Sequence, residues 1–200
     1  MGWLRKLFQP KNRAVVVVSG LPRSGTSMMM RMLDQGGLPV LVDNIRTPDE
    51  DNPRGYYEFE RVKKLPEGDI AWLKDAQGRV VKVLAVLLMH LPETYTYKVL
   101  FMRRDMQEML DSQRAMLVRR GEETDRVDDR EMARLFEKHV QDLYAWMDSR
   151  PNVQYLTIDY AAVMQSPADW ARRIRQFLDV DLDLGAMTAA VDPALYRQRH

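Results

Sequence analysis

Four apolar segments alternate with amphipathic ones along the chain, and this alternation predicts its architecture. The apolar segments cover residues 15–18, 79–87, 97–102 and 153–159. Segments without a polar face are typical of strands in a parallel sheet, because helices cover both faces of such a sheet. Helical spacing follows the first, third and fourth segments. We therefore predict an α/β fold of three layers, in which a central parallel sheet is flanked by helices.

The spacing of apolar residues within the predicted helices identifies the faces that they bury. The helix after the third strand is expected to bury Met106, Met109, Leu110 and Leu117, and to leave Ser112 and Arg114 on other faces. A helix over residues 128–147 is expected to bury Met132, Leu135, Phe136, Leu143 and Trp146. A helix over residues 168–178 is expected to bury Trp170, Ile174, Phe177 and Leu178. A shorter helix is expected over residues 69–75, and the methionines at 28–30 and 32 are interpreted as flexible core residues.

The first predicted strand leads into a glycine-bounded loop, residues 20–27 (GLPRSGTS), and then into a helix. Backbone N–H groups in such a loop and at the helix N-terminus are typical of phosphate binding. Gly20 and Gly25 have the separation found in the P-loop of nucleoside triphosphatases, and Ser27 stands where the hydroxyl belongs. Thr26, however, replaces the P-loop lysine. The loop therefore predicts a phosphate site that differs from a magnesium triphosphate site.

The missing lysine charge is supplied by Arg23, whose planar guanidinium can hold two oxygens of one phosphate. Residues 22–27 (PRSGTS) resemble the 5′-phosphosulfate loop of sulfotransferases that use 3′-phosphoadenosine 5′-phosphosulfate (PAPS). The likeness is greatest to the Pro-Arg-Ser-Gly-Thr-Thr form of the tyrosylprotein branch. The resemblance implies a P-loop-like sulfotransferase fold. It also implies that the donor is bound by Arg23, Ser24, Gly25, Thr26 and Ser27.

The end of the third strand carries a second part of the resemblance. Residues 103–105 (RRD) follow this strand and precede a helix. Ligands of doubly wound sheets gather at the carboxyl ends of strands. Sulfotransferases carry an arginine at this point and a serine eight positions later, and both hold the 3′-phosphate of PAPS. By resemblance, Arg104 and Ser112 take these roles here.

The remaining catalytic roles are assigned to residues on other segments. Lys82 interrupts an apolar strand, and a buried lysine that meets an anion suits the bridging oxygen of the donor. Leu84 stands where cytosolic sulfotransferases place a histidine base. Asp43 is the first candidate for the base and Glu58 the second, since a desolvated carboxylate can accept a hydroxyl proton. His90 is left open as a third candidate but is interpreted as a structural residue.

Residues 39–66 break the regular pattern with Pro, Gly and mixed charges. Long irregular stretches in compact domains are typical of binding loops, so we place the acceptor on this segment, called here the acceptor-side segment. Its Tyr56 and Tyr57 suit a small-molecule or peptide acceptor. The glycine-rich segment that completes the nucleotide site of cytosolic sulfotransferases is absent from the chain. The residues around the adenine therefore stay unassigned.

The amino-acid composition argues against several classes of function. With 30 Lys+Arg and 29 Asp+Glu, the chain lacks the excess charge of a nucleic-acid-binding protein. It has no cysteine and three histidines, which removes disulfide scaffolds and thiol catalysis and argues against a metal centre. Residues 1–12 form an extension whose apolar run is too short for a signal peptide or a membrane span. We expect one cytoplasmic domain of 200 residues.

The sequence thus predicts a metal-independent enzyme that transfers a sulfuryl group in line from PAPS to a hydroxyl or amine and leaves adenosine 3′,5′-bisphosphate (PAP). Two other functions stay open at this stage. One is a nucleotide kinase or triphosphatase with a degenerate phosphate loop, and the other is a nucleotide-binding module without activity.

Overall fold

The computed structural model describes residues 14–43, 45, 49, 55–122, 124 and 128–195. The strands of this part of the chain form one sheet in the order β2-β1-β3-β4, and every neighbouring pair is parallel. The strands are β1 (Val15–Gly20), β2 (Val80–Lys82), β3 (Tyr97–Arg103) and β4 (Val153–Asp159). The predicted central parallel sheet is confirmed.

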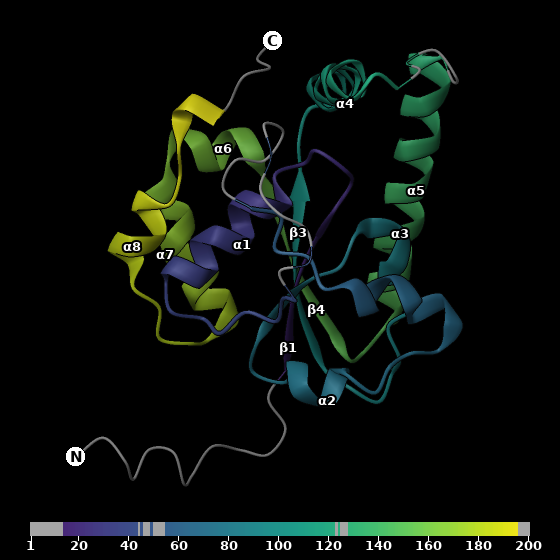
Figure 1. The fold of residues 1–200 in the computed structure, drawn as a ribbon. Helices are drawn as coiled ribbons and strands as arrows, with labels where there is room; N and C mark the ends of the chain where they lie inside the picture. The colour runs from purple at the N-terminus through teal and green to yellow at the C-terminus, as the bar shows by residue number, and fades with distance from the viewer. Residues whose placement is uncertain are drawn as a thin grey trace, which may run out of the picture.

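Helices cover both faces of the sheet (Figure 1). On one face lie α1 (Thr26–Gln35), α6 (Tyr160–Gln165), α7 (Pro167–Leu178) and α8 (Leu184–Ala189). On the other lie η2 (Glu60–Glu67), α2 (Leu73–Ala76), α3 (Ala85–Leu88) and α5 (Asp129–Ser149). The chain also forms α4 (Met106–Arg120), which crosses above the tip of β3, and η3 (Pro193–Leu195). The predicted three-layer architecture is confirmed.

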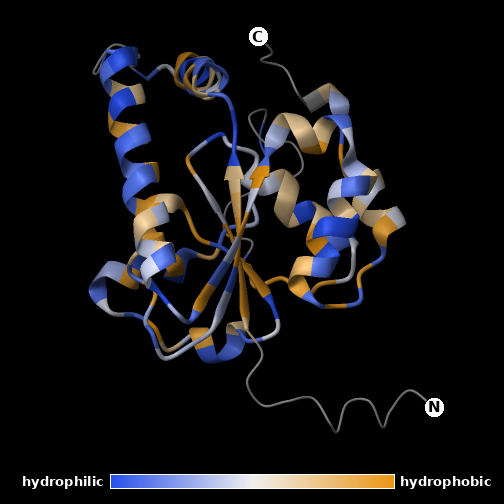
Figure 2. Ribbon diagram, turned by 180° about the vertical axis from the view of Figure 1, so that it is seen from behind, coloured by the Kyte–Doolittle hydropathy of each residue, from blue (hydrophilic) through white to orange (hydrophobic). Residues whose placement is uncertain are grey.

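Alternate residues of the strands enter two separate hydrophobic cores. Val15 and Val17 pack toward α5, whereas Val16 and Val18 pack toward α1. In Figure 2 the strands carry orange, apolar colour between helices whose outer surfaces are blue. Among the described residues, no helix is both long and apolar enough to cross a membrane. Of the four methionines predicted to be core residues, Met29, Met30 and Met32 are fully buried in the α1 core and Met28 is partly buried against it.

The second strand is shorter than predicted. It ends at Lys82, after which the Val83 N–H still reaches the Val18 carbonyl at 3.0 Å. Leu84 then caps α3, so residues 85–88 are helical although their apolar run was expected to be strand. An apolar run of this kind fits a buried helix as well as a strand. The correction moves Lys82 from the middle of a strand to its carboxyl end.

Several helix predictions also need correction. Ser112, which was expected on another face, is buried on α4 together with Glu108, one turn before it on the same face of the helix. Leu135 of α5 is 44% exposed, and Met147 is buried near the end of that helix. The residues just before Pro167 form helix α6, and η2 begins inside the acceptor-side segment. The predicted extension over residues 1–12 lies outside the described residues.

Local capping explains where many of these helices begin. The helices α4, α5, α6 and α8 each start after an aspartate whose side chain accepts a backbone N–H of the first turn: Asp105, Asp128, Asp159 and Asp183. At the C-terminal end of α7, Lys98 of β3 donates to the Phe177 and Leu178 carbonyls at 3.0 and 2.8 Å. By contrast, α1 starts after Gly25 without a side-chain cap. The N-terminus of α1 therefore lacks the side-chain acceptor that these other helices have.

Candidate functional site

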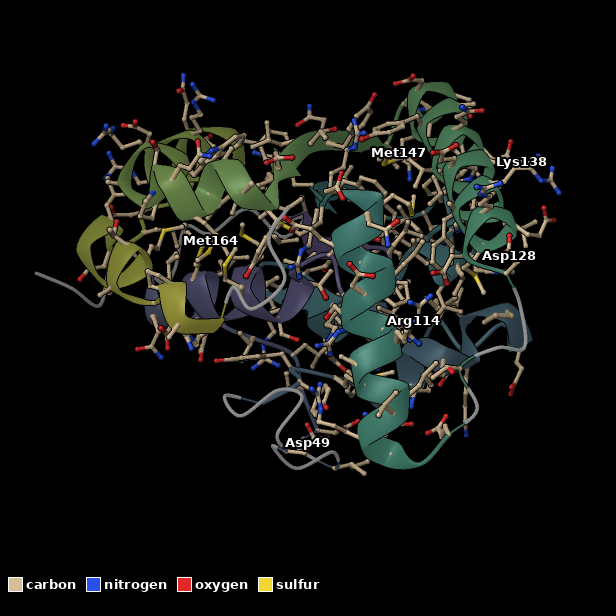
Figure 3. The ribbon with its side chains drawn as sticks, turned by 90° about the horizontal axis from the view of Figure 1, so that it is seen from above. Asp49, Arg114, Asp128, Lys138, Met147 and Met164 are labelled. Carbon is tan, nitrogen blue, oxygen red and sulfur yellow. The ribbon has the colours of Figure 1, made fainter. Side chains whose placement is uncertain are left out.

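The site lies at the carboxyl edge of the sheet, between β1 and β3. From β1 the chain moves to β2 on one side and later to β3 on the other, so the strand order reverses at this point. Such a switch point leaves a crevice in which open α/β sheets bind their ligands. Figure 3 looks onto this edge, with α4 crossing in front of it. The loop after β1 and the end of β3 both contribute side chains here.

The loop between β1 and α1 follows a tight path that depends on its glycines. Gly25 has a φ of 99°, and a Cβ there would collide with the ring of Tyr160. A Cβ on Gly20 would approach the Met102 carbonyl oxygen to 2.7 Å and would also strike the Ser24 hydroxyl. Arg23 adopts a φ of 68°, a conformation that costs a non-glycine residue on the order of 1 kcal/mol. The surrounding structure thus holds the backbone of the loop in one shape.

This loop provides several donors for an anion. The α1 N-terminus has no side-chain cap, and its macrodipole favours negative charge. Among the described residues, the buried hydroxyls of Ser19 and Ser24 have no hydrogen-bond partner. Buried hydroxyls without partners are rare in proteins unless a ligand or water satisfies them. The loop therefore has donors that suit a group with several oxygen atoms.

Arg23, Arg104 and Ser112 meet at this loop, although they are far apart in the sequence. The Arg23 Nε donates to the Ser112 hydroxyl at 2.9 Å, and Arg104 Nη1 donates to the Arg23 carbonyl at 3.3 Å. The predicted 5′-phosphate and 3′-phosphate residues are thus in direct contact. Both phosphates of PAP are attached to one ribose, so two adjoining anion sites suit this ligand.

Two further residues hold Arg104 in place, and neither was predicted from the sequence. Glu108 lies 2.8 Å from the Arg104 Nε, and both side chains are buried. The ring of Tyr160 lies under the guanidinium of Arg104 at 4.7 Å. Glu108 could have been identified, because it lies four residues before Ser112 and so shares its helix face, in the first turn after Arg104. The packing of Tyr160 depends on β4 and had no local signal.

Lys82, at the carboxyl end of β2, lies at the same site. Its ammonium group donates to the Tyr56 carbonyl at 2.7 Å and to the Ser27 hydroxyl at 3.3 Å. The Glu58 carboxylate lies 3.8 Å from the same nitrogen. Lys82 therefore connects the phosphate loop with the acceptor-side segment. Within the described residues, no cluster of three or more metal-ligating side chains is present.

The other two base candidates have different surroundings. Both carboxylate oxygens of Asp43 accept backbone N–H groups, from Ile45 at 3.1 Å and from Glu60 at 2.6 Å. Asp43 therefore fixes the start of η2. His90 is exposed and follows α3, and its N–H bonds to the Leu87 carbonyl. Of the three candidates, Glu58 is the one that the structure places against Lys82.

The acceptor-side segment also contacts α4. The Tyr56 hydroxyl donates to Asp49 at 2.5 Å, and Asp49 lies 3.9 Å from Arg120 at the end of α4. In Figure 3, Asp49 is found beside that end of the helix. Residues 44, 46–48 and 50–54 of the segment lie outside the described residues. Tyr56 thus links the segment both to Lys82 and, through Asp49, to α4.

Comparison with known proteins decides the family. A model described as "Sulfotransferase family" matches residues 59–183, which is more than half of the chain. The chain belongs to the sulfotransferase family. The match includes Lys82, Arg104 and Ser112 but begins after the phosphate loop. It does not distinguish the branches of this sulfotransferase family, so the likeness to the tyrosylprotein loop stays an observation on residues 22–27.

One solved structure supports the sulfotransferase fold, and two others have lower TM-scores. The sulfotransferase domain of the olefin synthase from Synechococcus PCC 7002 superposes with a TM-score of 0.54 and 16% identity, over 95% of this chain and 81% of that domain. A sulfotransferase domain from the curacin biosynthetic pathway gives 0.48 and 16% over 94% and 79%. A sugar kinase from Janibacter sp. HTCC2649 gives 0.43 and 16% over 90% and 99%. No curated protein matches the sequence.

Proposed function

We propose that this chain transfers a sulfuryl group from PAPS to a hydroxyl or amine of a small-molecule or peptide acceptor. The observation that carries the proposal is the contact of Arg23 with Ser112 and Arg104 at the switch point of the sheet. Two arginines and a serine from separate elements suit a ligand with two neighbouring phosphates better than a linear triphosphate. The unpartnered Ser24 hydroxyl and the uncapped α1 N-terminus supply further donors for the 5′-phosphosulfate.

Each of these residues has its own role in the proposed reaction. PAPS supplies the sulfuryl group, whose bond to the 5′-phosphate oxygen breaks as the acceptor oxygen or nitrogen bonds to sulfur. Arg23 and the N–H groups of residues 25–27 stabilise the charge that grows on the phosphate oxygen, whereas the Ser24 N–H already bonds to the Leu21 carbonyl. Lys82 lies beside Ser27 and adds a cation at the bridging oxygen. This assignment requires no metal ion.

Glu58 is the proposed base. Its carboxylate faces Lys82, and its side chain is 20% exposed, which leaves a path for the acceptor. A carboxylate in hydrogen-bond reach of the acceptor can take the proton as the new bond to sulfur forms. The Asp43 carboxylate already accepts two backbone N–H groups, so we assign it a structural role.

Ligand-dependent melting separates this function from the alternatives. We expect PAP to raise the melting temperature of the protein without magnesium, since a ligand that binds only the folded state stabilises it by about 2.7 kcal/mol at 100 times its Kd. ATP with magnesium is expected to stabilise it less. With an acceptor in hand, transfer from PAPS is expected to resist EDTA. Stabilisation by magnesium ATP alone would contradict the proposal and favour the kinase or triphosphatase.

The role of Ser112 at the 3′-phosphate has its own test. Ser112→Ala is expected to weaken PAP binding by about tenfold or more, because a hydrogen bond to a charged group contributes about 1.5–3 kcal/mol. Binding of adenosine 5′-monophosphate, which lacks the 3′-phosphate, is expected to change little. Titration calorimetry with both ligands measures the difference. Ser149→Ala on the exposed end of α5 is the matched control, and equal losses for both ligands would remove the assignment.

A further inference from the structure

The residues around Glu58 alternate between the two sides of the acceptor-side segment. The Tyr56 carbonyl and the Glu58 carboxylate both face Lys82, at 2.7 and 3.8 Å from its ammonium nitrogen. Tyr57, between them, points the other way and packs against the α1 core. Its hydroxyl donates to Asp34 of α1 at 2.9 Å. Tyr57 therefore connects the residues that touch Lys82 with the helix that follows the phosphate loop.

Glu58 is held by its neighbours on both sides. Phe59, the next residue, packs edge-on against Trp72 in the α5 core, with ring centroids 5.5 Å apart. Tyr57 and Phe59, which flank Glu58, are thus anchored in the two different cores of the protein. Since an aromatic side chain on each side restrains the backbone, the position of the Glu58 carboxylate depends on both contacts.

The backbone conformation of Tyr57 is unfavourable for a bulky residue, so the contacts of its side chain must stabilise it. Its φ of 53° is left-handed, which is a genuine outlier for a bulky residue. Such a conformation persists only where the surrounding contacts determine it. Burial, together with the bond to Asp34, raises the pKa of Tyr57 to about 12. The phenol therefore stays protonated and keeps donating to Asp34 at every pH near neutrality.

We propose that Tyr57, through its bond to Asp34, is a positioning residue that holds Glu58 against Lys82. The inference rests on the proposed function, in which Glu58 is the base. Asp34 lies eight residues after Thr26 on α1, about 12 Å along the helix axis. One rigid helix thus carries the donor site at its N-terminus and the tyrosine anchor near its C-terminus. This arrangement sets the distance between the base and the sulfuryl group.

Kinetics of Tyr57→Phe test the positioning role. Removal of the hydroxyl is expected to lower kcat about tenfold to a hundredfold, since small displacements of a catalytic group are costly, and to leave the KM for the donor within twofold. Asp34→Asn is expected to give a smaller loss, because the amide oxygen still accepts the bond. In a Glu58→Gln background, Tyr57→Phe is expected to have no further effect. An equal loss in both backgrounds would show a merely structural role and overturn the inference.

Tyr155→Phe is the matched control. Tyr155 makes a similar bond to Asp148, at 2.7 Å, near the amino end of β4. This variant is expected to keep wild-type kcat. If Tyr57→Phe also keeps wild-type kcat while Glu58→Gln is inactive, the inference is wrong and the proposed function stands.

Hydrogen exchange adds a measurement that needs no turnover. The amides of Asp43 and Glu60 bond to the Glu58 carbonyl and to the Asp43 side chain, so they report on this stretch. Tyr57→Phe is expected to speed their exchange about tenfold, with no change in β3, whereas Tyr155→Phe leaves them unchanged. Unchanged exchange of these two amides in Tyr57→Phe would show that the bond of Tyr57 to Asp34 does not hold this stretch in place. If the protein binds no PAP and transfers no sulfuryl group, the proposed function fails, while exchange still decides whether the anchor exists.

Discussion

Arg23→Ala is expected to reduce kcat by about 10³-fold, with little change in the melting temperature. Arg23 lies on the loop between β1 and α1, and its guanidinium reaches Ser112, so it contacts the proposed donor rather than the core. Removal of a preorganised donor at the developing negative charge costs about 10²–10³-fold in other enzymes, and here a full positive charge is lost as well. A sulfuryl-transfer assay at saturating donor, together with thermal melting, measures both quantities.

Two variants make this result specific to the guanidinium. Arg23→Lys keeps the charge but loses the planar fork, and it is expected to recover only part of the activity. Arg134→Ala removes an arginine that is 65% exposed on α5, and it is expected to be active. Wild-type turnover by Arg23→Ala would exclude Arg23 from the donor site. A large drop in melting temperature would instead assign it to folding.

Arg104→Met is expected to destabilise the fold by about 3–5 kcal/mol. The side chains of Arg104 and Glu108 are 9% and 5% exposed, and loss of the arginine leaves the Glu108 carboxylate buried without its partner. The double variant Arg104→Met/Glu108→Leu removes both charges and is expected to recover most of this stability. Chemical denaturation of the three proteins measures the free energy of unfolding.

The same double variant separates folding from ligand binding. It is expected to fold but to bind PAP far more weakly than wild type, because the cation proposed for the 3′-phosphate is gone. Lys138→Met is the control, since Lys138 and Asp142 are also an i,i+4 pair but are 65% and 52% exposed. Its expected cost is below about 1 kcal/mol. Wild-type affinity for PAP in the folded double variant would remove Arg104 from the proposed site.

The sequence predicted the elements whose signals are local. The apolar runs at residues 15–18 and 97–102, the second interrupted only by Lys98, have no polar face and so indicated buried strands of a covered sheet. The motif in residues 22–27 was recognisable as a candidate phosphate loop because its residue types and their spacing lie within one short segment. Residues 85–88 were wrongly predicted as strand, since an apolar run of that length also fits a buried helix.

What only the tertiary structure decided are the contacts between segments that are distant in the chain. Arg23 and Ser112 are 89 residues apart, and Lys82 is 26 residues from Tyr56, so no periodicity relates them. The sequence by itself determined the α/β layers and the phosphate loop, because hydrophobic alternation and glycine spacing act within one segment. The partners of Lys82 and the burial of Ser112 followed from the packing of the sheet, which brings the carboxyl ends of its strands to one edge.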